Sequence, residues 1–350
     1  MHQHGDCYMP YCGGKRRFSL PKEAEFPQRK GYIYVDGRMI ERNQKHTGGN
    51  EVEFTQPIFK GVKYTKMLPQ GTALVLEGGG TRGFYTSGVF EAFMDSGIMF
   101  PYIIGVSAGA ANALTYIAGQ KGRNRVIVEK FVGDKRYVSR RNLVRYRSLF
   151  GFEFIFGTIP EKHLFFDRES FDDTDIRFLT GVIDCVSGKT VWFEKRNVSN
   201  GFIIARASCS VPLISKIVKY NGLELLDGGI SDPIPIEKSI ADGNGFHVVV
   251  LTRNEGYTKE PFCHGRLLKI FYGKYPNLVD AILKRHEIYN RQLALCEQLE
   301  REKKALIIRP LQPLTVGRAA TDTEKLLALY DEGHEEGAQA VETLKTILAF

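Results

Sequence analysis

A short serine turn between two glycines is the feature that most limits how this 350-residue chain can fold. The pentapeptide GVSAG at 105–109 follows an apolar run at 102–104 and precedes a run of small residues that favours a helix. Gly105 and Gly109 allow a tight strand-to-helix turn because they have no Cβ atom. A serine in such a turn exposes its hydroxyl beside a helix N-terminus, which favours developing negative charge. The pattern predicts an α/β fold with Ser107 as a nucleophile.

Apolar strand patterns and helical patterns alternate along the middle of the chain. Strands are predicted at 72–76, 102–104, 178–184, 190–194, 223–226 and 247–252. Helical patterns lie between several of them, at about 85–96, 201–210 and 236–241. This alternation predicts a layered α/β domain with a mostly parallel central sheet.

The two ends of the chain differ from the middle. Residues 1–70 are polar with scattered glycine, which predicts a largely irregular extension with one hairpin around Asp36-Gly37. After about residue 255 the strand signal fades, and amphipathic segments at 277–304 and 323–349 predict helices. We therefore expect an extension at 1–70, an α/β domain at 71–255 and a helical region at 256–350 packed on that domain.

The cysteine pattern and the lengths of the apolar runs argue against a metal site, a membrane span and a secretory signal. The six cysteines are dispersed, and no spacing of His and Cys matches a zinc site, so we expect reduced thiols and no metal. No apolar run is long enough for a membrane span, and the N-terminal residues lack the apolar core of a secretory signal. These features predict a cytoplasmic protein. The oligomeric state cannot be inferred from the sequence.

Positive charge is concentrated between residues 121 and 147. This segment holds ten Lys and Arg residues but only Glu129 and Asp134 as acids. Such a segment suggests an anionic partner, and a membrane surface is the better candidate because no nucleic-acid-binding motif is present. A solvated helix face is the other interpretation. The candidate membrane contacts, at the inner face, are Arg140, Arg141, Arg145 and Arg147.

A glycine loop lies one strand before the serine turn. The residues EGGGTRG at 77–83 follow the strand at 72–76 and formally satisfy the dinucleotide pattern G-x-G-x-x-G. That interpretation needs an acid at the end of the second strand, where this chain has the serine turn instead. The alternative is that backbone N–H groups converge to hold an oxyanion, with Arg82 adding positive charge. We favour the oxyanion interpretation, with Gly78 and Gly83 supporting the loop.

A serine hydroxyl needs a base to accept its proton. Five histidines follow Ser107, and none is placed at the carboxyl end of a predicted strand; they are His163, His247, His264, His286 and His334. Asp227 is so placed, directly after the strand at 223–226 and before Gly228 and Gly229. Because active sites of α/β domains form at that end of the sheet, Asp227 is the candidate base, although an Asp-Gly-Gly turn alone is common.

The loop EGGGTRG, the turn GVSAG and the turn DGG, in this order, resemble the patatin-like phospholipase family, in particular its bacterial branch. The resemblance covers about residues 72–252. It implies a three-layer α/β domain in which Ser107 is the nucleophile and Asp227 the base of a dyad. It also implies an oxyanion hole from the N–H groups of Gly79 and Gly80, with Arg82 in support. No metal or organic cofactor is implied, and the substrate would be a phospholipid or lysophospholipid.

One residue departs from that family pattern. Glu77 stands before the glycines, where many members have a small residue. A carboxylate near an oxyanion hole must point away from it or be paired.

Two other functions stay open at this point. An esterase or thioesterase acting on soluble acyl substrates would use the same residues. A non-catalytic lipid-binding or regulatory module is the alternative of another class, although such a protein is expected to lose Ser107, Asp227 or a loop glycine.

Overall fold

The computed structural model describes residues 32–35, 38–41, 61–198 and 201–349. The chain divides into two units, Met1–Thr55 and Gln56–Phe350. In the first unit, strands β1 (Tyr32–Val35) and β2 (Arg38–Glu41) pair antiparallel. This pairing confirms the predicted hairpin, whose Asp36-Gly37 turn lies outside the described residues, as does the rest of the first 60 positions.

The second unit is built on an eight-stranded sheet. Its strand order is β12–β11–β4–β6–β7–β10–β9, and β8 pairs with the free edge of β7. The parallel strands are β12 (Ala305–Ile308), β11 (Phe246–Val250), β4 (Thr72–Leu76), β6 (Tyr102–Val106) and β7 (Arg177–Asp184). Antiparallel pairings add β8 (Thr190–Glu194), β9 (Val218–Tyr220) and β10 (Leu223–Asp227). The mostly parallel sheet is as predicted.

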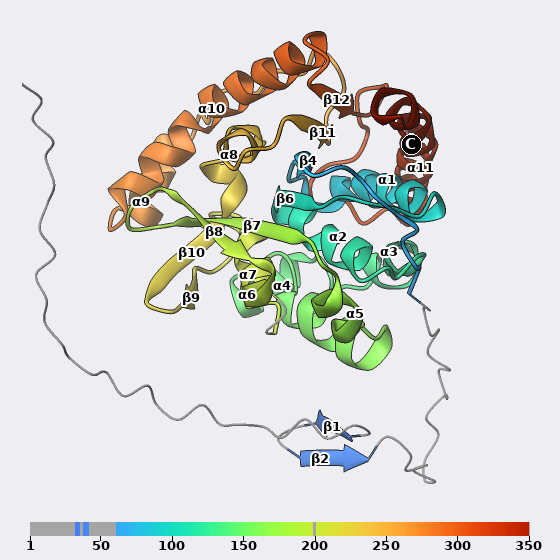
Figure 1. Cartoon of the computed structure of the whole chain (residues 1–350). Helices are drawn as coiled ribbons and strands as arrows, with labels where there is room; N and C mark the ends of the chain where they lie inside the picture. The colour runs from blue at the N-terminus through green and yellow to red at the C-terminus, as the bar shows by residue number, and fades with distance from the viewer. Residues whose placement is uncertain (1–31, 36–37, 42–60, 199–200, 350) are drawn as a thin grey trace, which may run out of the picture. The chain divides into compact units, whose positions relative to one another are not determined.

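Helices cover both faces of this sheet, so that three layers form (Figure 1). Strand β4 illustrates the layers, because every one of its residues is buried. Leu74 and Leu76 belong to the core beneath α1 (Phe84–Asp95), α2 (Ser107–Ile117) and α11 (Thr323–Leu348). Ala73 and Val75 point to the other core, which includes residues of α8 (Ile236–Ala241) and α10 (Pro276–Arg301). Burial on both faces explains why this strand is a continuous apolar run.

The C-terminal helix α11 packs closely on α1. A Cβ atom at Gly88 of α1 would clash with the carbonyl oxygen of Tyr330, and one at Gly333 of α11 would clash with that of Tyr85. The two helices therefore cross with their backbones in contact, which only residues without a side chain allow. This packing agrees with the expected helical C-terminal region.

Two elements of the C-terminal region differ from the sequence prediction. The sequence predicts a helical region at 256–350, yet β12 pairs in parallel with β11 and forms the sheet edge. Helix α9 (Gly265–Tyr272) precedes the predicted long helices. No separate pattern indicates β12, because its four apolar residues directly follow a long helical pattern.

Two short helical turns, η1 (Gly80–Gly83) and η4 (Gly228–Ile230), follow β4 and β10. The other helices lie between β6 and β9 in the chain. They are α3 (Arg123–Ile127), η2 (Val128–Val132), α4 (Arg140–Tyr146), η3 (Phe154–His163), α5 (Arg168–Asp173), α6 (Lys195–Val198) and α7 (Ile203–Ser208). A short parallel pair, β3 (Lys66–Met67) with β5 (Ile98–Met99), ties the start of the second unit to the turn after α1. Within the described part of the chain, no helix combines the length and the apolar character needed to cross a membrane.

Candidate active site

Two strands meet end to end on one edge of β7. Strand β6 pairs with this edge as far as Val106, opposite Gly181. Strand β10 runs antiparallel and takes the next position, where Asp227 is opposite Val182. Since β8 pairs with β7 over the same stretch, β6 and β10 must share the other edge. The residues that end these two strands are therefore neighbours in space although they are far apart in sequence.

Ser107 and Asp227 form a direct hydrogen bond at this junction. The Ser107 hydroxyl donates to Oδ2 of Asp227 over 2.7 Å, and both residues are only 6% exposed. The second carboxylate oxygen, Oδ1, accepts a bond of 2.8 Å from the N–H of Gly229. Burial raises the pKa of Asp227, while the bond from Ser107 and the positive charge of Arg285 act in the opposite direction.

The backbone of Ser107 is held in an unusual conformation. Its φ of 52° lies in the left-handed region, which costs a non-glycine residue about 1–3 kcal/mol. The N–H of Ser107 donates to Oγ of Ser208 over 2.7 Å, and this hydroxyl donates to the carbonyl of Gly181, also over 2.7 Å. Ser208 thus connects the turn to the strand that aligns it. Sequence reasoning missed Ser208, because a serine inside a predicted helix carries no signal of this role.

The predicted glycine loop passes directly over Ser107. A Cβ atom at Gly78 would be 2.7 Å from the Cβ of Ser107, so only glycine allows this approach. Gly80 has a φ of 60°, and a Cβ there would clash with the carbonyl oxygen of Arg318. The same carbonyl accepts a bond of 2.9 Å from the N–H of Thr81. The loop is therefore fixed between the serine turn and the segment before α11.

Glu77 is paired, as expected for an acid beside this loop. Its carboxylate accepts a bond of 2.6 Å from the N–H of Thr252, and the hydroxyl of Thr252 donates to the carbonyl of Gly78 over 3.0 Å. Arg82 is buried, and its nearest charged neighbours include Glu77 and Arg253. Burial lowers the pKa of Arg82 to about 10, against the raising effect of Glu77. Thr252, at the end of β11, is a second residue that sequence reasoning missed.

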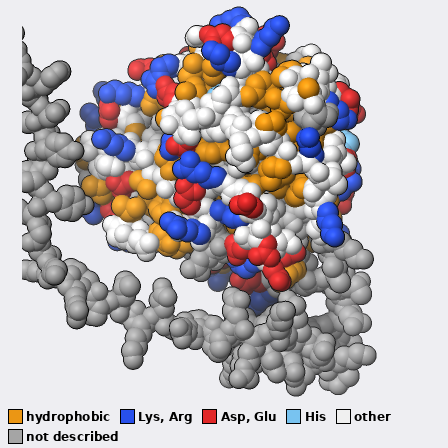
Figure 2. Space-filling model, in the orientation of Figure 1, with side chains coloured by type: hydrophobic (Ala, Val, Ile, Leu, Met, Phe, Trp, Pro, Cys, Tyr) orange, Lys and Arg blue, Asp and Glu red, His pale blue; other side chains and the backbone are white. Residues whose placement is uncertain are grey.

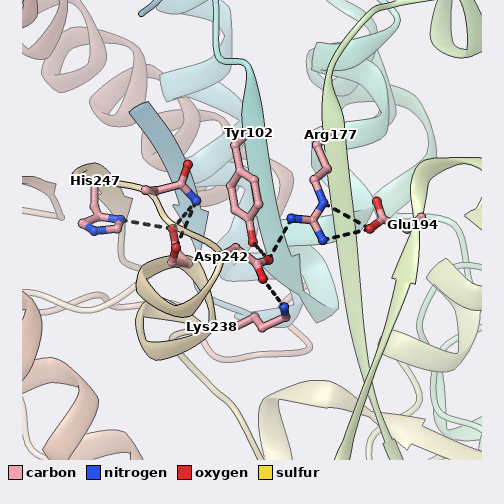
Figure 3. A network of polar contacts seen from close by, with 8 residues as sticks. Tyr102, Arg177, Glu194, Lys238, Asp242 and His247 are labelled. Atoms are coloured by element: carbon pink, nitrogen blue, oxygen red, sulfur yellow. Dashed lines mark hydrogen bonds and ion pairs between the residues drawn. The ribbon is translucent and has the colours of Figure 1, made fainter. Parts of the chain in front are cut away.

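His247 is far from Ser107. It starts β11 level with Tyr102, five positions before Ser107, which is roughly 16 Å along the strand. Figure 3 shows it beside the network that joins Tyr102, Asp242 and Arg177 at the amino ends of the strands. Its Nδ1 is 3.1 Å from the Ser239 hydroxyl, and burial lowers its pKa to about 4.

The other four histidines also have partners elsewhere. His163 stacks on Phe131, His264 contacts Cys263, His286 bonds to the carbonyl of Leu283 and His334 pairs with Asp95. Among the residues that the structure describes, there is also no group of three or more His, Cys, Asp or Glu side chains suited to a metal ion.

Comparison with known protein families matches residues 74–240 to the model described as patatin-like phospholipase. Residues 74–240 form a patatin-like phospholipase domain. Residues 275–349 match a second model, described only as a domain of unknown function. The Ser107 turn, the glycine loop and Asp227 all lie within the patatin-like domain.

Curated relatives match between about half and four fifths of the chain. The uncharacterised protein YjjU of Escherichia coli is 29% identical over 189 residues, which cover 53% of this chain and 52% of YjjU. The uncharacterised NTE family protein Mb1092c of Mycobacterium bovis is 25% identical, covering 47% of this chain and 44% of that protein. Lysophospholipase NTE1 of Candida glabrata is 25% identical and covers 79% of this chain but 16% of NTE1. This chain spans about half the length of the first curated relatives it matches.

A mainly apolar cavity opens at Ser107 in the patatin-like domain. The space within it, counted together with its open mouth, is about 900 Å³. Its lining includes Gly80 and Ser107 at one end and aromatic side chains from η3 and the segments around it. The principal apolar lining residues are Phe84, Leu114, Phe152, Phe156, Phe166 and Phe202.

In the folded chain, some basic residues of the segment at 121–147 are buried or ion-paired, and others are exposed. Arg123 is buried and donates to the carbonyl of Leu164, and three other basic residues are ion-paired, namely Lys121, Arg125 and Arg136. The four predicted membrane contacts are exposed on or directly after α4; they are Arg140, Arg141, Arg145 and Arg147. Val144 lies among them and is 85% exposed. By contrast, acidic side chains gather over α5, as Figure 2 shows.

Proposed function

We propose that this chain is a serine acyl hydrolase that cleaves lipid esters, with a phospholipid or lysophospholipid as its substrate. The observation that carries the proposal is the buried hydrogen bond of 2.7 Å between Ser107 and Asp227, placed at the mouth of an apolar cavity. The name of lysophospholipase NTE1, a relative of this chain, supports the same substrate class.

In the proposed mechanism, Ser107 Oγ attacks the ester carbonyl while Asp227 Oδ2 receives the hydroxyl proton. The carbonyl oxygen becomes negative and is stabilised by the N–H groups of Gly79 and Gly80, with the charge of Arg82 behind the loop. Collapse of this intermediate passes the proton to the departing alcohol and leaves an acyl-Ser107 ester. Water then gives a proton to Asp227 and attacks the acyl carbonyl. Collapse of this second intermediate breaks the bond to Ser107 Oγ, which takes the proton back from Asp227, and the fatty acid is released.

The raised pKa of Asp227 suits this role. A carboxylate with an ordinary pKa near 3.9 is a weak base for a hydroxyl, and burial makes it a stronger one. Ser107 already donates to it, so the proton has a formed path. The apolar cavity would hold the acyl chain and exclude water from it.

The substrate class can be tested with purified protein and two kinds of acyl ester. We expect fatty acid release from phospholipid and lysophospholipid, at a higher kcat/KM than from short-chain nitrophenyl esters or acyl thioesters. Hydrolysis of the soluble esters alone would instead make the chain an esterase or thioesterase. Absence of turnover on all of them would contradict the hydrolase proposal.

Helix α4 is the proposed contact with an anionic membrane. The four exposed arginines on or directly after α4 lie on both sides of the exposed Val144 in sequence. The chain then continues to Phe150 and Phe152, which line the cavity. A basic surface with an apolar residue at its centre suits an anionic lipid interface.

Reversing the four charges tests this contact. The variant Arg140→Glu, Arg141→Glu, Arg145→Glu, Arg147→Glu should bind liposomes containing phosphatidylserine at least about 100-fold more weakly, because each basic residue near such a surface is worth about 1 kcal/mol. Liposome sedimentation measures the affinity. Its affinity for uncharged phosphatidylcholine liposomes should match the wild type, and unchanged binding to the anionic liposomes would rule the contact out.

A further inference from the structure

Five cationic side chains surround the outer side of the glycine loop and the Asp227 turn. They come from separate parts of the chain, and we call them the cation cluster: Arg82, Arg253, Lys259, Arg285 and Arg318. Arg285 belongs to α10, and Arg318 to the segment before α11. Four of the five, Arg253, Lys259, Arg285 and Arg318, lie beyond the residues that match the patatin-like model.

Two residues of the cluster contact the backbone next to the proposed catalytic residues. The guanidinium of Arg285 donates to the carbonyl of Gly229, whose own N–H bonds to Asp227. The carbonyl of Arg318 accepts from Thr81, and its Cβ would be 3.2 Å from a Cβ at Gly80. Since Gly80 also lines the apolar cavity, the cavity and the cluster meet at the glycine loop.

Carboxylates compensate the positive charge of the cluster only in part. None of the five forms an ion pair within 4.0 Å of a carboxylate in the described part of the chain, and the nearby acids already have other partners: Glu77 bonds to Thr252, and Asp227 bonds to Ser107. The buried Nε atoms of Arg82 and Arg253 have no hydrogen-bond partner. Burial and the neighbouring arginines lower the pKa of Lys259 to about 7.

Aromatic and amide groups hold these cations in place without cancelling their charge. The ammonium of Lys259 is 4.6 Å from the ring centre of Tyr289, and the guanidinium of Arg253 is 4.4 Å from that of Tyr257. The backbone of Lys259 is fixed at both its N–H and its carbonyl by the side chain of Asn290. Unpaired cations in fixed positions are suited to an anion with several acceptor oxygens.

We infer that the cation cluster binds a phosphate group, that of the phospholipid head group whose ester carbonyl lies at Ser107. The inference rests on the proposed function. The acyl chain would lie in the apolar cavity and the phosphate in the cluster, so that the ester between them lies at the glycine loop. The C-terminal region thereby supplies substrate recognition, because it contributes Lys259, Arg285 and Arg318.

The test compares two lipids that share an acyl chain and differ in phosphate. Oleoyl lysophosphatidic acid and monooleoylglycerol are supplied in uncharged detergent micelles, and kcat/KM is measured for each. In the variant Lys259→Met, Arg318→Gln, the ratio of the phosphorylated to the neutral substrate should fall about tenfold or more, because charge-assisted hydrogen bonds are lost. The matched variant Arg301→Gln, Lys345→Met removes the same charge from exposed positions and should keep the wild-type ratio.

A second measurement separates this inference from the proposed function. Inorganic phosphate and glycerol 3-phosphate are titrated into wild type and both double variants by calorimetry, which needs no turnover. Binding by the wild type that the Lys259→Met, Arg318→Gln variant loses supports the phosphate site even if no ester is cleaved. If phosphate binds but the lipid ratio is unchanged, the head-group assignment is wrong and the site holds free phosphate. No phosphate binding and an unchanged ratio would overturn the inference altogether.

Discussion

Replacing Asp227 with asparagine should lower kcat for ester hydrolysis by at least about 10³-fold, as should replacing Ser107 with alanine. Asparagine can still accept the bond from the N–H of Gly229, so the turn is preserved, but its amide cannot take a proton from Ser107. Steady-state rates on a short-chain nitrophenyl ester measure the effect. Near-normal rates in Asp227→Asn would mean that another group is the base.

The chain offers a matched control for this variant. Asp232 is half-buried, also has a raised pKa, about 6, and accepts a bond from Gln292 rather than from Ser107. Asp232→Asn should therefore keep the wild-type rate.

Lower folding stability should not be the cause of the lost activity in Asp227→Asn. Because burial raises the pKa of Asp227 above its value in the unfolded chain, the protonated carboxyl favours the folded state, and this contribution is lost as pH rises through the folded pKa. At neutral pH, Asp227→Asn should then melt no lower than the wild type.

The same pKa sets the acid limb of the pH profile. Only ionised Asp227 can act as the base, so kcat/KM should fall with decreasing pH at a midpoint above 3.9, the ordinary value for aspartate. This limb should persist in Asp232→Asn, which excludes the neighbouring half-buried acid as its source.

Replacing Gly80 with alanine should lower kcat on soluble esters by about 10²–10³-fold, the effect of losing one oxyanion donor. Alanine is disfavoured at a φ of 60°, and its methyl group would clash with the carbonyl oxygen of Arg318. Since that oxygen is backbone and holds Thr81, the loop has to move, and its N–H groups turn away from the proposed oxyanion position. The rate on nitrophenyl acetate and the melting temperature are measured together.

Gly317 provides the control for Gly80. It precedes Arg318 in the same segment, but a Cβ atom there would have no neighbour within 4 Å. Gly317→Ala should keep both rate and stability. A wild-type rate in Gly80→Ala would show that this loop contributes no donor to the reaction.

Much of the fold could be predicted from local patterns. Strand β4 is fully buried and therefore has a clear apolar pattern, and both β4 and α8 are found where the sequence indicated. Strand β12 was missed because it is only four residues long, and its place at the sheet edge depends on a partner, β11, more than fifty positions earlier. Local periodicity contains no information about such a pairing.

The prediction for Asp227 rested on a partly wrong picture. We expected its strand to run with the parallel strands and to end at their carboxyl edge, yet β10 is antiparallel to β7. Asp227 reaches Ser107 because β10 and β6 pair with the same edge of β7, and β10 begins its pairing where that of β6 ends. Ser208 and Thr252 could not be found for a related reason, since their roles come from contacts with Gly181 and Glu77 that are made only in the folded chain.

Because β6 and β10 meet end to end, the Ser107–Asp227 bond forms only when β10 pairs with β7 in the correct register. A slip of β10 by one residue along β7 would move Asp227 by about 3.3 Å and turn its side chain to the opposite face of the sheet. Such a misaligned chain would keep most of its apolar burial and its compactness while losing the bond. Specific activity, rather than helix content or size, is then the sensitive measure of whether refolded or heterologously expressed protein has reached its native alignment.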